Sequence, residues 1–164
     1  GARIDWARAF GVPVPIVNTR ARLAVLPYHD VHHLVTGYRT DEAGEAEVGA
    51  WTLGTAGGPR LGRVYDLGTF GLGLLRWPRR TMVAFWRGRQ GRHLYDLPVN
   101  ELLATEADEL TARARADAIV EPPQLADWLA FGRAILAAAG WWLTPAAPLF
   151  MAWTALEEWS EHRD

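Results

Sequence analysis

Apolar residues recur at three- and four-residue spacing along most of the chain, and runs in which β-branched residues alternate with polar ones are scarce. The first pattern is typical of helices that bury one face, whereas the second would indicate strands. The opening GVPVPIVN is expected to be extended or turn-like, because its prolines restrict the backbone. Its last residue, Asn18, is expected to cap the helix that begins TRARLAVL. With 164 residues, the chain can bury the core of one domain. We therefore predict an all-α fold, a single helical domain with a C-terminal apolar helical hairpin.

Pro122 and Pro123 mark a boundary within this domain. We expect residues 1–121 to form the helical, metal-binding part. Residues 122–164 are expected to form an apolar hairpin of two helices, QLADWLAFGRAILAAAGWW and APLFMAWTALEEW, that is packed on this part or associated with a membrane.

Residues 134–156 carry no charge and are about as long as a segment that spans a bilayer. Gly140, Pro145 and Pro148 interrupt this segment. The sequence leaves three arrangements open: a buried hairpin, a hairpin in or on a membrane, and a single kinked span.

The composition excludes several classes of function. A net charge of −2 gives no global attraction to nucleic acid, so no nucleic-acid partner is expected. The absence of cysteine excludes disulfides, thiolate metal sites and cysteine nucleophiles. All 17 basic residues are arginine and no signal peptide is evident, which favours a bacterial protein of the cytoplasm or the cytoplasmic face of the inner membrane. The nine tryptophans suit either a core or an interface, including a homodimer or a membrane surface.

An arginine cluster lies between a glycine-rich segment, residues 57–77, and Pro98. Its members are Arg76, Arg79, Arg80, Arg87, Arg89 and Arg92. Such a cluster could meet anionic lipid headgroups or a phosphate, and a solvated helix face is the ordinary alternative. We take Arg76, Arg79 and Arg80 as candidate substrate-binding residues.

Three of the five histidines fall within one turn of a predicted short helix that Gly37 closes. On a helix, His29 and His33 share one face, His32 lies at its edge, and Asp30 can reach the same ion only at the rim of the site. Imidazole and carboxylate together suit zinc first, with cobalt, manganese or iron also compatible. The segment that follows, YRTDEAGEAEV, is expected to be a turn. A further ligand from the following loop or helix would complete a site with open positions.

Two other histidine patterns fit less well. The spacing H-x-x-H-H matches the histidine boxes of membrane di-iron enzymes, but those enzymes need several boxes, and only His93 and His162 remain elsewhere. The adjacent His-Asp pair of metal-dependent phosphohydrolases needs an upstream histidine, and none precedes His29.

The segment resembles the signature of the coenzyme Q biosynthesis protein 4 family, H-D-x-x-H followed after eleven residues by E. His29, Asp30 and His33 match its first part, and Glu45 falls at the required spacing. Further agreement comes from Gly37, Thr40 and Gly44, and the resemblance is strongest over residues 18–97. It implies that His29, Asp30, His33 and Glu45 bind the metal. It leaves His32 outside the motif, and Glu42 and Glu47 are carboxylates at the wrong spacing.

The resemblance implies a role in ubiquinone biosynthesis, namely metal-dependent oxidative decarboxylation at C1 of a polyprenylated hydroxybenzoate-type quinone precursor, as a lyase. The alternative is a non-catalytic scaffold that binds isoprenoid lipid and presents it to other quinone biosynthesis proteins. A third reading is a structural ion whose removal would unfold the domain. The sequence departs from the family pattern after Glu45 and beyond Pro123, which points to a divergent member.

Overall fold

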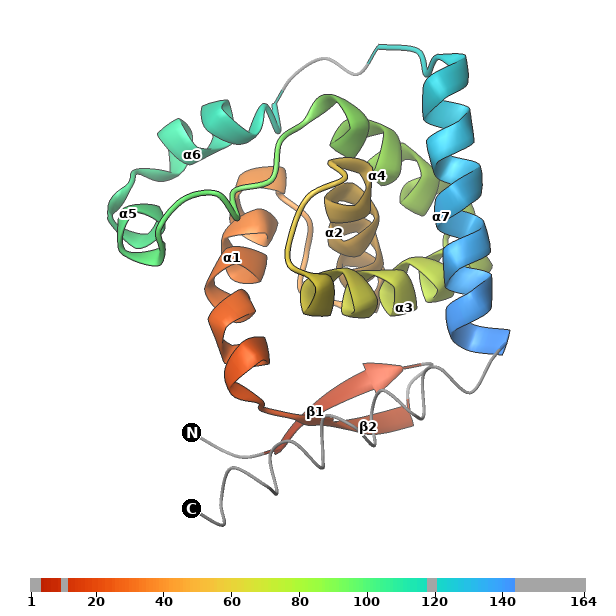
Figure 1. Cartoon of the computed structure of the whole chain (residues 1–164), viewed down its shortest axis with the longest axis horizontal. Coiled ribbons are helices and arrows are strands. Elements are labelled where there is room, and N and C mark those ends of the chain that lie inside the picture. The colour runs from red at the N-terminus through yellow and green to blue at the C-terminus, as the bar shows by residue number, and fades with distance from the viewer. Residues whose placement is uncertain (1–3, 10–11, 118–120, 144–164) are drawn as a thin grey trace.

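Seven helices and one two-stranded hairpin make up the part of the chain that the computed structural model describes, residues 4–9, 12–117 and 121–143 (Figure 1). The hairpin consists of β1 (Ile4–Ala9) and β2 (Val12–Val17). The helices are α1 (Arg20–Thr36), α2 (Glu42–Gly54), α3 (Arg60–Arg76), α4 (Pro78–Gln90), α5 (Val99–Ala104), α6 (Ala107–Ala114) and α7 (Leu125–Leu143). The predicted helical class is therefore confirmed for the body of the molecule.

The hairpin is the one element that departs from an all-α description of these residues. β1 and β2 pair antiparallel, with Ile4 opposite Val17 and Ala9 opposite Val12. The extended backbone expected for the proline-containing opening is thus confirmed. A two-stranded sheet consists only of edge strands, and edge strands tolerate proline because its missing N–H can face away from the partner strand.

Helix α2 lies at the centre of the molecule, with α3 and α4 packed against it (Figure 1). Its residues Val48, Ala50 and Trp51 are fully buried. Close approach of α3 depends on Gly73, because a Cβ there would lie only 2.7 Å from the Cβ of Ala46. Helix packing thus explains glycine at this position of the glycine-rich segment.

Helix α7 packs against α3 and contributes to the hydrophobic core. Its Phe131 makes edge-on contacts with Phe70 of α3 and Phe85 of α4, at centroid distances of 5.9 and 5.2 Å. Aromatic pairs in this geometry add about 0.5–1.5 kcal/mol to the free energy gained by burial. The first helix of the predicted hairpin is confirmed as α7, and the second, APLFMAWTALEEW, lies outside the described residues.

Among the helices that the structure describes, none combines the length and apolarity that a bilayer crossing requires.

Helix α1 carries the histidines and runs through Pro27 without a break. Its N-cap is Thr19, whose side chain accepts a hydrogen bond from the backbone N–H of Arg22, where we expected Asn18. The Oδ1 of Asn18 instead accepts from the guanidinium of Arg22. Gly37, at φ 73°, ends the helix in the left-handed conformation that glycine adopts without strain, as predicted.

Candidate metal centre

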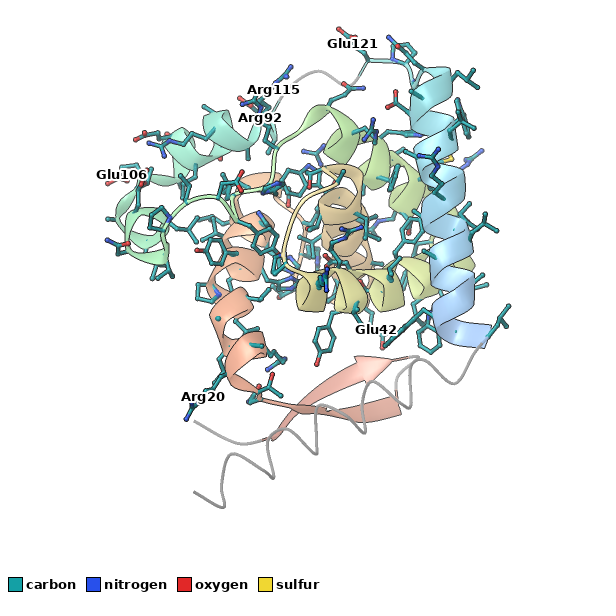
Figure 2. The ribbon with its side chains drawn as sticks, in the orientation of Figure 1. Arg20, Glu42, Arg92, Glu106, Arg115 and Glu121 are labelled. Atoms are coloured by element: carbon teal, nitrogen blue, oxygen red, sulfur yellow. The ribbon has the colours of Figure 1, made fainter. Side chains whose placement is uncertain are left out.

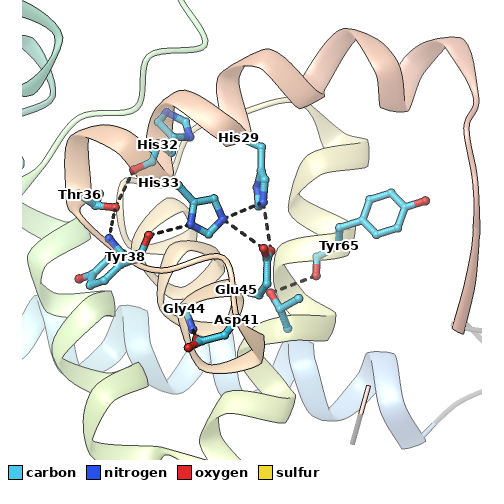
Figure 3. Close-up of polar contacts among 10 residues, drawn as sticks. His29, His32, His33, Thr36, Tyr38, Asp41, Gly44, Glu45 and Tyr65 are labelled. Carbon is cyan, nitrogen blue, oxygen red and sulfur yellow. Dashed lines mark hydrogen bonds and ion pairs between the residues drawn. The ribbon is translucent and has the colours of Figure 1, made fainter. Parts of the chain in front are cut away.

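His29 and His33 project from the same face of α1 and meet at their ring nitrogens (Figure 3). Their Nε2 atoms lie 3.2 Å apart, and the rings stand nearly perpendicular, at 79°. The predicted four-residue spacing on one helical face is thus confirmed.

Glu45 approaches the two histidines from α2 (Figure 3). Its Oε2 lies 3.1 Å from Nε2 of His29, and its Oε1 lies 3.3 Å from Nε2 of His33. We expected the segment around Glu45 to be a turn, but α2 already begins at Glu42, so Glu45 is held by the first turn of a helix. Its ligand atom and those of His29 and His33 all lie within 4.8 Å of one another.

The turn between α1 and α2 explains how Glu45 reaches α1 after so few residues. Asp41 caps α2, because its Oδ1 accepts a hydrogen bond from the backbone N–H of Gly44 at 2.9 Å. A Cβ at Gly44 would lie 1.7 Å from the carbonyl oxygen of Arg39, so only glycine lets the chain fold back this tightly.

The spacing of the three residues suits a small divalent ion. Zinc binds imidazole nitrogen and carboxylate oxygen at about 2.0–2.2 Å, so tetrahedral ligands lie about 3.3–3.5 Å from one another. The two Nε2 atoms lie 3.2 Å apart, and each lies 3.1 or 3.3 Å from a different oxygen of Glu45, which is close to that value. Two histidines and one glutamate leave further coordination positions free for water or a substrate, as in catalytic zinc and non-haem iron sites.

The carbonyl oxygen of Tyr38 fixes the orientation of His33. It lies 3.1 Å from Nδ1 of His33, and a carbonyl can only accept, so Nδ1 carries the hydrogen. In the neutral imidazole, Nε2 then presents its lone pair to His29 and Glu45. Metal-binding histidines are commonly held in this way by a partner on the far nitrogen.

Burial and charge act in opposite directions on the pKa values of His33 and Glu45. Burial lowers the pKa of His33, but its hydrogen bond and charge interaction with Glu45 outweigh this effect and leave the pKa raised. Burial raises the pKa of Glu45, but its contacts with His29 and His33 bring the pKa down to about 2. The exposed fractions of the side chains, 7% for His33, 27% for His29 and 37% for Glu45, place the solvent-facing side of the centre at Glu45.

Asp30 and His32 lie apart from this group. Asp30 is exposed on α1 and does not join the three clustered ligand atoms. His32 is fully buried, and its Nε2 accepts a hydrogen bond from the backbone N–H of Leu94. Burial, followed by the nearby histidines, lowers the pKa of His32 to about 3, so it stays neutral. His32 therefore belongs to the core.

The other two carboxylates of α2 are occupied by arginines. Glu42 pairs with Arg76 at 3.0 Å, and Glu47 accepts two hydrogen bonds from Arg80, at 2.9 and 2.6 Å. Neither carboxylate turns toward the histidines. Arg79 is exposed. The substrate-binding role of Arg76, Arg79 and Arg80 stays a prediction, and two of these guanidinium groups already serve α2.

The remaining arginines do not gather into one patch with them. Figure 2 places Glu42, the partner of Arg76, at the lower edge of the helical body and Arg92 at the upper edge. Arg87 donates to the carbonyl oxygen of Ala116, and Arg89 pairs with Asp127.

Two residues at or near the centre carry no obvious signal in the sequence. Tyr38 acts through a backbone carbonyl, which no side-chain pattern reveals. Asp66, on α3, is a buried acid near Glu45. An acid within the apolar stripe of a predicted helix is the sequence signal that could have identified it.

Comparisons of the chain with protein-family models, with curated proteins and with solved structures find no match.

Proposed function

We propose that the chain is a divalent-metal enzyme of ubiquinone biosynthesis that oxidatively decarboxylates C1 of a polyprenylated hydroxybenzoate-type precursor. In this reaction the C1–carboxyl bond breaks with loss of carbon dioxide, a C1–hydroxyl bond forms, and an external two-electron oxidant such as dioxygen takes up the electrons. The observation that supports this most directly is the meeting of His29, His33 and Glu45, three motif residues from two helices, at ligand distances from one another. The motif spacing supplies the link to the pathway, and the geometry supports the metal chemistry that such a reaction needs.

A bound ion would supply Lewis acidity to a phenol oxygen and a neighbouring carboxylate of the ring. The chain's own residues set up that chemistry. Tyr38 holds His33 in the tautomer whose Nε2 is free to bind. Glu45 contributes one negative charge, so a divalent ion held by Glu45 and two neutral histidines keeps a net positive charge that attracts an anionic ring. The partly exposed Glu45 and His29 leave that ring a route from solvent.

The donor set fits zinc and also cobalt, manganese or ferrous iron. Metal analysis of the purified protein distinguishes these. About one ion per chain in the wild type, lost in His33→Ala, supports the metal centre. Release of labelled carbon dioxide from a carboxyl-labelled prenylated hydroxybenzoate by the loaded protein supports the reaction. No metal uptake under any loading condition would remove the basis of the proposal.

A second candidate function is a lipid-binding scaffold at a membrane surface. Helix α7 favours it, because an apolar stripe along its outer side is exposed to solvent. The stripe comprises Leu125, Trp128, Leu129, Ile135, Leu136, Trp142 and Leu143. Such a stripe could bind an isoprenoid chain, the cytoplasmic face of a bacterial membrane, a second copy of the chain or other quinone biosynthesis proteins. Isoprenoid lipid that co-purifies with a protein lacking turnover would favour this function over catalysis.

A further inference from the structure

Asp66 is a buried acid that lacks a full set of partners. Its exposed fraction is 5%, and its Oδ2 makes no hydrogen bond to any residue that the structure describes. An unpaired buried carboxylate is costly, so the group takes up a proton instead. Burial, followed by the charge of Glu45, raises the pKa of Asp66 well above its usual value. Unlike a carboxylate, a neutral carboxyl can donate a hydrogen bond.

Helix packing places Asp66 beside the metal centre. Helix α3 meets α2 at Gly49, where a Cβ would lie 3.4 Å from the Cα of Asp66. Glu45 is four residues before Gly49 and therefore lies on the same face of α2. The charged groups that act on Asp66 are Glu45 from α2 and Arg63 from α3, and Asp66 acts in turn on Tyr95, in the segment between α4 and α5.

Tyr95 packs against α3 near Asp66. Its hydroxyl lies 3.6 Å from the position that a Cβ at Gly62 would take, and Gly62 is four residues before Asp66 on α3. Its ring packs on Tyr28 and His32 of α1, at centroid distances of 5.2 and 5.0 Å. Asp66, on α3, thus packs against α2, which carries Glu45, and acts on Tyr95, whose ring packs on the helix that carries His29 and His33.

We propose that Asp66 donates a hydrogen bond to an anionic oxygen of the metal-bound ligand, a phenolate or carboxylate oxygen of a hydroxybenzoate-type ring. The inference rests on the proposed function, because it requires an ion at His29, His33 and Glu45. Asp66 does not join the clustered ligand atoms, which suits a group that contacts the ligand and not the ion. A neutral donor stabilises an anionic oxygen, whereas a second carboxylate would repel it.

The test uses the full chain loaded with Co²⁺, whose visible absorption reports its ligands, and titrates it with 4-hydroxybenzoate at pH 7. Asp66→Leu removes the donor and is expected to weaken binding of the probe by about tenfold or more. Asp66→Asn keeps an N–H donor and should stay within about threefold of the wild type. Thr69→Val is the matched control, because Thr69 lies one turn further along α3 and its hydroxyl donates to backbone carbonyls of that helix. It should bind the probe like the wild type.

The outcomes separate this inference from the proposed function. Equal probe binding by the wild type and Asp66→Leu would overturn the inference. Wild-type protein that binds Co²⁺ but not the probe would also overturn it. The metal centre would stand in both cases. If Asp66→Asn loses as much affinity as Asp66→Leu, an ionised carboxylate acts there and the neutral donor is wrong. If the wild type fails to bind Co²⁺, the proposed function falls and the inference falls with it. Circular dichroism confirms folding, and Asp66→Ala replaces the leucine variant if that one does not fold.

Discussion

The Nε2 atoms of His29 and His33 lie 3.2 Å apart, and each also faces a different oxygen of Glu45. At this distance the two nitrogens cannot both carry a hydrogen that points at the other, because the hydrogens would clash. Two lone pairs that face each other would repel, so a proton or a cation must lie between these groups. Because Tyr38 already accepts the Nδ1 hydrogen of His33, a metal ion satisfies the three facing atoms more fully than a single proton does.

Glu45→Ala should weaken zinc binding far more than Glu42→Ala. The first change removes a ligand. We expect the dissociation constant for zinc to rise by about 100-fold or more, because loss of a group that only hydrogen-bonds to a ligand already costs about 10–100-fold. The second removes the ion-pair partner of Arg76, which is not a member of the metal centre, and should change the constant by less than about threefold. A competition titration with a chromophoric chelator measures both. Equal effects would contradict the assignment of Glu45.

The stabilisation that zinc confers should grow with pH. The raised pKa of His33 means that the metal-free ion pair with Glu45 is strongest between about pH 4.5 and 6.5 and weakens as the pH rises through the pKa of folded His33. The same deprotonation frees Nε2 for the ion. The increase in Tm on adding zinc should therefore be larger at pH 8 than at pH 5.5 by differential scanning fluorimetry. An increase that does not depend on pH would argue against His33 as a ligand.

The sequence predicted the helical class and the pairing of His29 with His33, because both follow from local periodicity. It did not predict the β-hairpin, since both strands are only six residues long and the two prolines of β2 made that segment resemble a loop. It placed Glu45 at the right spacing but in a turn, because the cap that starts α2, Asp41 bonded to Gly44, was read as part of a longer acidic turn. The burial of Asp66 depends on how three helices pack, which no single segment encodes.

His32 should control stability and not metal binding. Its Nε2 accepts from the backbone N–H of Leu94 in the core, so His32→Ala leaves that donor unpaired and opens a cavity, at a cost of about 2–4 kcal/mol in the free energy of unfolding. Urea denaturation measures this loss. Zinc affinity of the folded variant should stay within about threefold of the wild type, whereas His33→Ala should lose zinc binding. Loss of zinc binding by folded His32→Ala would place His32 in the metal centre.

The neutrality of His32 also predicts a loss of stability in acid. Its folded pKa of about 3 lies below the unfolded value of 6.5, so the unfolded chain binds a proton that the folded chain does not. This contribution falls by about 1.4 kcal/mol per pH unit as the pH drops from 6.5 toward 3. His32→Gln, which cannot titrate, should lose less stability over that range in urea titrations at fixed pH. Parallel slopes for the two proteins would contradict a neutral His32.

Asp66→Leu should raise the thermal stability of the metal-free protein. The leucine replaces a buried carboxyl whose Oδ2 has no partner among the described residues with an apolar group of similar size, which removes a desolvation cost of about 1–3 kcal/mol. In a domain of this size, 1 kcal/mol corresponds to about 2–4 °C in Tm. Thr69→Val, on the same helix, loses no comparable unpaired group and serves as the control. A stabilised protein that also binds the ring probe less tightly would indicate that the chain retains Asp66 for its ligand and not for its fold. A destabilised one would mean that Asp66 has structural contacts that the leucine cannot replace.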